Sequence, residues 1–300
     1  MSETAHMERE LSSQPQSWRS AVRLAASGTP LPEAGRRVAV VGCGTSWFMA
    51  QAYAALRERA GLGVTDAFAA SEALLGAERE YDVVLAITRS GTTTEVLRLL
   101  EAVRGRIPTV TVLGDPDTPA RELSDETVAL PFADELSVVQ TRFATSALAL
   151  LRSHLGEDVS GAVRDAEEVL SVPVRQEWVE AGQFSFLGTG WTVGLAHEAA
   201  LKMREASQSW TESYPAMEYR HGPISIAAPG RVTWLFGPSP EGLEEEVART
   251  GAVFVHHERR DPLAELVLVQ RVALERARAR GLDPDAPRSL TRSVMLDDTP

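Results

Sequence analysis

The sequence predicts an α/β fold of two tandem doubly wound domains, each a parallel sheet flanked by helices. Short apolar runs typical of buried strands alternate with stretches of helical pattern along most of the chain. A glycine turn between a strand and a helix occurs at Gly42 and again at Gly188, which indicates a repeated unit. The length of 300 residues also exceeds what one small core needs.

Strands and helices are expected at similar intervals in both halves. In the first half we expect strands at 37–41, 83–87 and 109–113, and helices at 47–59, 95–103 and 139–155. In the second half we expect strands at 184–187, 231–236, 252–256 and 266–269, and helices at 193–209, 241–250 and 270–280. The expected divisions are an N-terminal arm and helix, a first domain, a second domain and a C-terminal tail, at residues 1–35, 36–160, 175–285 and 286–300.

The composition argues against several classes of protein. The net charge of −12 disfavours a nucleic-acid partner, because the phosphate backbone requires a basic surface. No apolar run reaches the roughly 20 residues of a membrane-spanning helix. The single cysteine, Cys43, excludes an intrachain disulfide and a cysteine-cluster metal site, and no metal or other cofactor is expected. Residues 1–16 lack an apolar signal core, so we expect a cytoplasmic protein.

Hydroxyl side chains gather at two predicted strand ends. Residues 88–94 form a strand-to-helix turn with five Ser or Thr side chains around Gly91, and Thr45 and Ser46 follow the strand before it. Hydroxyls and helix N-terminal amides are good donors to a phosphate dianion, so these turns predict a phosphate site. The alternative is that the same side chains only cap helices.

The glycine turns do not predict a nucleotide site. The segment at 42–47 lacks the third glycine of the dinucleotide-binding turn and carries hydroxyls in place of small apolar residues. It also lacks the lysine-containing ending of a P-loop. NAD and ATP are therefore disfavoured.

A second candidate site lies on the helix at 193–209. Glu198, Lys202 and Glu205 share one stripe of this helix, and Lys202 is the only lysine among 30 basic residues. A carboxylate beside an ammonium in a pocket can transfer protons, whereas the alternative is a solvent-facing ion-paired stripe. His221, in the turn at 218–223, is either a ring-opening acid–base group or a solvated loop histidine.

These segments resemble the SIS (sugar isomerase) superfamily, in particular the isomerase half of glutamine–fructose-6-phosphate aminotransferase and its stand-alone relatives. The resemblance is carried, in family order, by residues 7–15, 42–46, 88–93, 198–205, 218–223 and 287–294.

The resemblance implies a phosphosugar enzyme. The residues it implies for the phosphate are Ser46, Thr88, Ser90 and Thr93, with Arg89 beside them. It further implies that Glu205 moves a proton between C1 and C2 next to Lys202, while Glu198 positions the substrate. His221 would open the sugar ring in the neighbouring subunit's site, which implies a homodimer with a shared active site.

Two departures from the family limit the activity. We expect no glutaminase domain with its N-terminal cysteine, and Arg292 stands where the resemblance places the lysine that forms an imine in the aminotransferase. A guanidinium stays protonated and cannot be that nucleophile. The expected activity is isomerisation at C1–C2 of a hexose or amino-sugar 6-phosphate, with or without release of ammonia or an amine. The alternative is a sensor that binds a phosphosugar without catalysis.

Overall fold

The structure is a computed structural model that describes residues 6–76 and 79–296. These residues form two compact units, each with its own sheet. The five-stranded unit comprises residues 16–159 and 291–296, and the four-stranded unit comprises residues 6–15 and 160–290. Each is therefore assembled from chain segments that are far apart in sequence.

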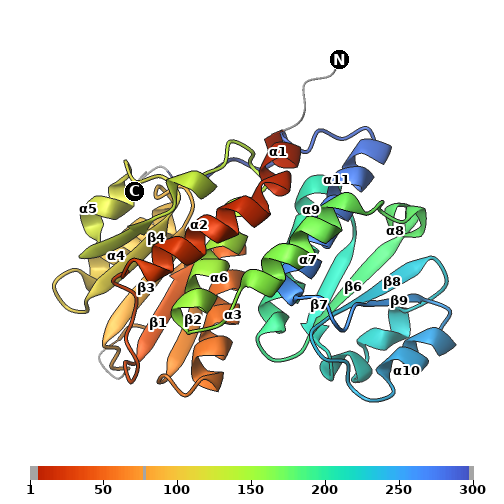
Figure 1. Cartoon of the computed structure of the whole chain (residues 1–300), viewed down its shortest axis with the longest axis horizontal. Coiled ribbons are helices and arrows are strands. Elements are labelled where there is room, and N and C mark those ends of the chain that lie inside the picture. Colours follow the sequence, from red (N-terminus) through yellow and green to blue (C-terminus); the bar gives the residue numbers. More distant parts are fainter. Residues whose placement is uncertain (1–5, 77–78, 297–300) are drawn as a thin grey trace. The chain divides into compact units, whose positions relative to one another are not determined.

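The five-stranded unit has a parallel sheet with the strand order β2-β1-β3-β4-β5 (Figure 1). Its strands are β1 (Val38–Gly42), β2 (Thr65–Ala69), β3 (Val83–Thr88), β4 (Thr109–Leu113) and β5 (Glu126–Ala129). Its helices are α2 (Gln14–Ala26, which begins just before the unit), α3 (Thr45–Arg59), α4 (Thr94–Val103), α5 (Pro119–Leu123) and α6 (Arg142–His154).

Both faces of this sheet are covered. Ala39 and Val41 of β1 pack with α4 in one apolar cluster. Since side chains alternate along a strand, Val38 and Val40 point to the opposite face, and they are also fully buried. The central strands β1, β3 and β4 are buried at every residue, as expected for parallel strands between two helical layers.

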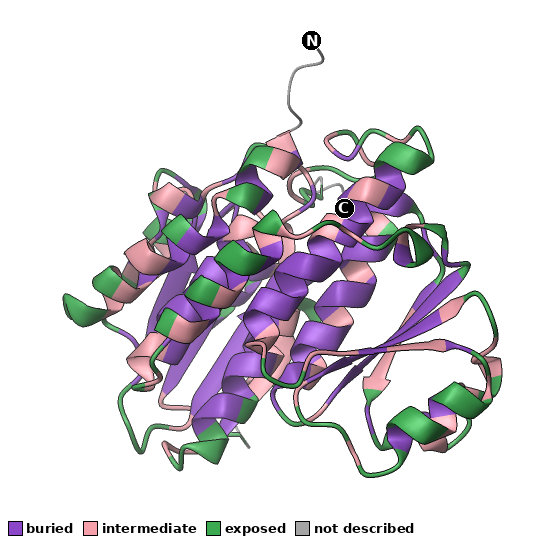
Figure 2. Ribbon diagram, turned by 45° about the vertical axis from the view of Figure 1, so that its right-hand side comes forward, coloured by how far each residue is buried: buried purple, intermediate pink, exposed green. Residues whose placement is uncertain are grey.

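The four-stranded unit has a parallel sheet with the order β7-β6-β8-β9. Its strands are β6 (Gln183–Gly188), β7 (Thr211–Pro215), β8 (Arg231–Phe236) and β9 (Val253–His256). Its helices are α1 (His6–Ser12), α7 (Ser160–Ser171), α8 (Gln176–Glu180), α9 (Thr192–Ser207), α10 (Leu243–Arg249) and α11 (Pro262–Ala279). Helix α11 packs against α9 and α7, whereas α10 keeps an exposed face, coloured green in Figure 2.

One predicted strand is wrong. Residues 266–269 belong to α11, which is a single helix and not a strand followed by a helix at 270–280. The carboxylate of Asp261 caps this helix by accepting the N–H of Leu263, and Pro262 occupies its first position. Because the helix is buried almost all round, its apolar run has no visible 3.6-residue period and reads like a buried strand.

The two glycine turns have the same physical cause. A Cβ at Gly42 would lie 2.7 Å from the backbone carbon of Ser46, and one at Gly188 would lie 2.4 Å from the backbone oxygen of Thr192. In each unit the first turn of the helix therefore rests directly on the end of the strand. Only glycine leaves room for this contact.

We expect Gly188→Ala to lower the free energy of unfolding by about 1–3 kcal/mol, because a methyl group must push the α9 backbone away from β6. Urea unfolding measures this. Gly182→Ala, just before the same strand, is the matched control, since its Cβ would meet nothing closer than 3.7 Å. Equal stability of the two variants would contradict the close-packing explanation.

Candidate functional site

The two hydroxyl-rich turns lie at neighbouring strand ends. β1 and β3 pair in parallel, and the strand order turns back between them because β2 lies on the other side of β1. In open parallel sheets this switch point is where ligands bind, beyond the carboxyl ends of the strands. The turns at 42–46 and 88–94 therefore lie together at the carboxyl ends of the strands of the five-stranded sheet.

The loop at 88–94 is shaped by its own hydroxyls. Ser90 Oγ accepts the N–H of Thr92 at 3.2 Å, and Thr88 Oγ1 accepts the N–H of Gly91 at 3.3 Å. Gly91 has a φ of +62°, and a Cβ there would lie 2.0 Å from the Thr118 hydroxyl. The loop is consequently a tight, glycine-dependent turn.

Helix capping does not account for the hydroxyls at these turns. Thr93 is the N-cap residue of α4 but makes no side-chain capping hydrogen bond. Thr45 and Ser46 are the first two residues of α3, whose N-cap is Gly44. The alternative that these side chains serve only as caps is therefore not supported.

Arg89, a residue of this loop, binds the backbone of two other segments of the unit. This buried guanidinium donates to the backbone carbonyls of Ser137 (2.8 Å), Val138 (3.2 Å) and Arg292. These contacts direct its donors at the backbone, so a contact between Arg89 and a phosphate stays a prediction.

Arg292 holds the C-terminal tail to the same unit. Its guanidinium donates to the Asp134 carboxylate at 2.7 Å and to the Glu135 carbonyl at 3.1 Å. The adjacent Ser293, which the sequence analysis did not single out, contacts the hydroxyls of the 88–94 loop. Only its place within the family-like stretch 287–294 could have drawn attention to it.

The predicted carboxylate–lysine cluster is formed on α9 of the four-stranded unit. Lys202 Nζ lies 3.5 Å from Glu198 Oε1 and forms a hydrogen-bonded ion pair with Glu205. The side chains of Lys202 and Glu198 are 0% and 1% exposed, while that of Glu205 is 19% exposed. The alternative of a solvent-facing stripe is therefore wrong for Lys202 and Glu198.

A cavity of about 370 Å³ opens at Glu205. It is lined by Leu201, Arg204, Glu205, Gln208, Ser209, Arg288 and Leu290, all from the four-stranded unit. Burial lowers the pKa of Arg204, with the charges of Glu205 and Glu198 acting in the opposite direction. Glu205 is thus the member of the cluster that a ligand can reach.

His221 is placed differently. It is exposed and follows the 3₁₀ turn at Glu218–Arg220. Within the part of the chain that the structure describes, its ring makes no hydrogen bond to Glu198, Lys202 or Glu205. Its expected role toward a second subunit stays a prediction.

Residues 6–76 and 79–296 contain neither a metal-binding cluster nor a membrane-spanning helix. No group of three or more His, Cys, Asp or Glu side chains in these ranges is arranged to hold a metal ion. No helix in the same ranges is long and apolar enough to cross a membrane.

Comparison with known proteins gives three findings. Residues 32–152 match the family model of the SIS domain. The glutamine–fructose-6-phosphate aminotransferase (isomerizing) of Sulfurisphaera tokodaii is 28% identical over 297 residues, covering 87% of this chain and 50% of that protein. The chain thus spans about half the length of the curated relatives it matches.

The third finding concerns solved structures, which show the fold. Glucosamine-6-phosphate deaminase from Thermotoga maritima has a TM-score of 0.82 at 23% identity, covering 97% of this chain and 100% of that one. Tagatose-6-phosphate ketose/aldose isomerase from Escherichia coli has a TM-score of 0.73 at 17% identity, covering 94% and 95%.

We expect Lys202→Met to lower the free energy of unfolding by roughly 3 kcal/mol, because it removes the ammonium that lies 3.5 Å from the buried Glu198 carboxylate and leaves two carboxylates on one helix stripe without it. Urea unfolding near neutral pH measures the loss. The matched control is Glu275→Gln on α11, whose ion pair with Arg278 is exposed and whose loss costs less than about 1 kcal/mol. A similarly small effect for Lys202→Met would show that the cluster is not held by its charges.

We expect Cys43 to react slowly with iodoacetamide. Burial, with a smaller contribution from the Glu95 carboxylate, raises the pKa of its thiol from 9.0 to about 11. At pH 8 the thiolate fraction is then on the order of a hundredfold lower than for an ordinary thiol, and it rises as the pH approaches the raised pKa. Intact-mass spectrometry gives the rate, with the urea-unfolded chain as control. Equal rates in the folded and unfolded chains would contradict this assignment.

Proposed function

We propose that this protein isomerises a hexose 6-phosphate or amino-sugar 6-phosphate at C1–C2, because residues 32–152 match the family model of the SIS domain. Where the substrate carries nitrogen at one of these carbons, the same proton transfer gives an imine, and addition of water to its C=N bond releases ammonia or an amine and leaves a carbonyl group. The observation that carries the proposal is the buried Lys202 ammonium between Glu198 and the partly exposed Glu205.

The phosphate is proposed to bind at the carboxyl ends of the central strands of the five-stranded sheet. Ser46, Thr88, Ser90 and Thr93 supply hydroxyls at the switch point between β1 and β3, and Thr45 lies beside Ser46. The amino-terminal ends of α3 and α4 add partial positive charge at the same strand ends. A dianion is therefore favoured there without a basic surface.

Proton transfer is assigned to Glu205. A carboxylate that reaches a cavity can take the proton from one carbon and return it to the next, through an enediol or enolamine intermediate. Lys202 holds this carboxylate in place, and its ammonium also lies 3.5 Å from the Glu198 carboxylate. We assign ring opening to His221 of a second subunit, so the active protein is proposed to be a homodimer in the cytoplasm.

The relatives' names and Arg292 together favour this reaction class. The names describe enzymes of fructose 6-phosphate, glucosamine 6-phosphate and tagatose 6-phosphate, and one of them is a deaminase. Arg292 is a protonated guanidinium bound to Asp134, so it offers no nucleophile for the imine of an aminotransferase. Isomerisation or deamination is therefore preferred to amino transfer.

We expect the wild-type protein to exchange deuterium into C1 or C2 of at least one of three sugar phosphates in D₂O. The substrates are fructose 6-phosphate, glucosamine 6-phosphate and galactosamine 6-phosphate, followed by NMR with a parallel ammonia assay. Glu205→Gln should slow the exchange by about 10²–10⁴-fold, because it removes the base, while sugar-phosphate binding is kept.

Glu275→Gln, on the exposed face of α11, is the control and should exchange as fast as wild type. Binding without exchange by the wild-type protein would contradict the enzymatic proposal and favour a phosphosugar sensor. Exchange that survives in Glu205→Gln would contradict the assignment of the base.

A further inference from the structure

The hydroxyl of Ser293 lies inside the group of loop hydroxyls assigned to the phosphate. Its Oγ is 3.1 Å from the Ser90 hydroxyl, 3.0 Å from that of Thr92 and 3.4 Å from that of Thr93. One side chain of the tail therefore contacts three hydroxyls of the 88–94 loop and accepts from those of Ser90 and Thr92, although it is about 200 positions away in the sequence.

The tail backbone also uses the beginning of α4. The N–H of Thr94, the first residue of this helix, donates to the carbonyl of Val294 at 3.1 Å. The N–H of Leu296 donates in turn to the Thr94 hydroxyl at 2.9 Å. An N-terminal helix amide is a donor of the kind that binds phosphate in other proteins. The tail thus takes backbone and side-chain donors from the same site.

Charged contacts hold Ser293 in this position. Arg89 donates to the carbonyl of Arg292, and the Arg292 guanidinium binds Asp134 and the carbonyl of Glu135. The Glu135 carboxylate in turn accepts the N–H groups of Thr141 and Arg142 at the start of α6, both at 2.7 Å. The tail is therefore attached to a fixed part of the unit.

We propose that Ser293 competes with the substrate's phosphate for the loop and thereby sets the affinity for phosphorylated ligands. A phosphate oxygen that accepts from Ser90, Thr92 and Thr93 needs the place of the Ser293 Oγ. The dianion forms stronger, charge-assisted hydrogen bonds than the neutral hydroxyl, so it displaces Ser293 at an energetic cost. The inference rests on the proposed function, because it takes the loop as the phosphate site.

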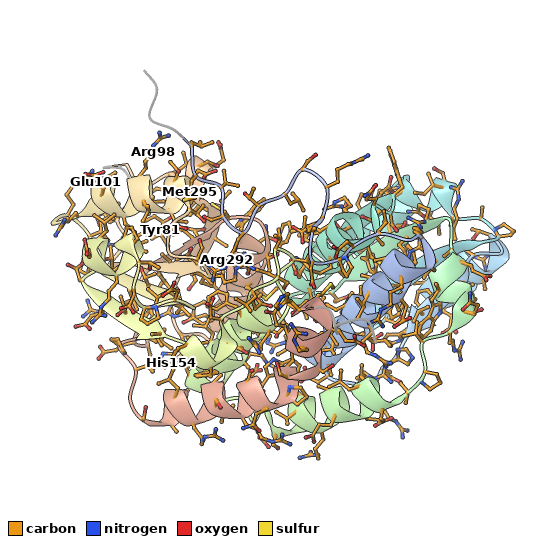
Figure 3. The ribbon with its side chains drawn as sticks, turned by 90° about the horizontal axis from the view of Figure 1, so that it is seen from above. Tyr81, Arg98, Glu101, His154, Arg292 and Met295 are labelled. Carbon is orange, nitrogen blue, oxygen red and sulfur yellow. The ribbon has the colours of Figure 1, made fainter. Side chains whose placement is uncertain are left out.

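Removing the competing hydroxyl should tighten binding. We expect Ser293→Ala to bind inorganic phosphate and glucosamine 6-phosphate about 5- to 30-fold more tightly than wild type, corresponding to one or two net hydrogen bonds that no longer have to be broken. Isothermal titration calorimetry of the full chain measures this, with unphosphorylated glucosamine as the negative probe. Met295→Ala is the matched control, since Met295 is on the same tail, is 70% exposed and is labelled in Figure 3.

Hydrogen exchange gives a second readout on the tail itself. Adding inorganic phosphate to the wild-type protein should speed exchange of the Leu296 amide, because its contact with Thr94 is lost. Tighter binding by Ser293→Ala together with this loss of protection supports the inference.

Two other results would overturn it, and they are distinguishable. In the first, wild-type protein binds phosphate at least as tightly as Ser293→Ala does, and exchange of the Leu296 amide does not change. This result overturns the competition and leaves the proposed function in place. No binding of either phosphate compound to wild type or Ser293→Ala overturns the phosphate site, and the competition with it.

Discussion

Both sheets depend on one constraint, the close approach of a helix to the strand that precedes it. At Gly42 and at Gly188 the first helical turn rests on the strand end at a distance that excludes any side chain. In the five-stranded unit this contact fixes α3, with Thr45 and Ser46 in its first turn. In the four-stranded unit it fixes α9, which carries the carboxylate–lysine cluster. Both candidate sites thus depend on the same kind of close contact between a strand end and the helix that follows it.

The lysine and the two arginines near these sites make different contacts because their charged groups differ in shape. Lys202 has a compact ammonium that fits between two carboxylates on one helix, and it is fully buried. Arg89 and Arg292 instead spread their planar donors over several backbone carbonyls and Asp134, and they hold the tail. A lysine in the tail would be a possible nucleophile. The guanidinium of Arg292 instead attaches the tail to Asp134 and to the carbonyl of Glu135.

The residue pattern does not reveal an element whose burial is unusual for its type. The strands β2, β5 and β7 were not predicted because each lies at the edge of a sheet and its half-exposed sequence lacks an apolar run. Helix α11 was divided into a strand and a helix because burial on nearly all sides removed its amphipathic period. The central strands were predicted well, since β3, β4 and β8 are apolar and bounded by turns.

Features that depend on local spacing follow from the order of the residues alone. These are the alternation of strands and helices, the hydroxyl-rich turns, and the placement of Glu198, Lys202 and Glu205 on one stripe of a helix. Three further features appear only in the folded chain: the pairing of β1 with β3, the burial of Lys202 and the contact of Ser293 with the 88–94 loop. The physical reason is that burial and long-range contacts depend on the path of the whole chain, which residue spacing does not specify.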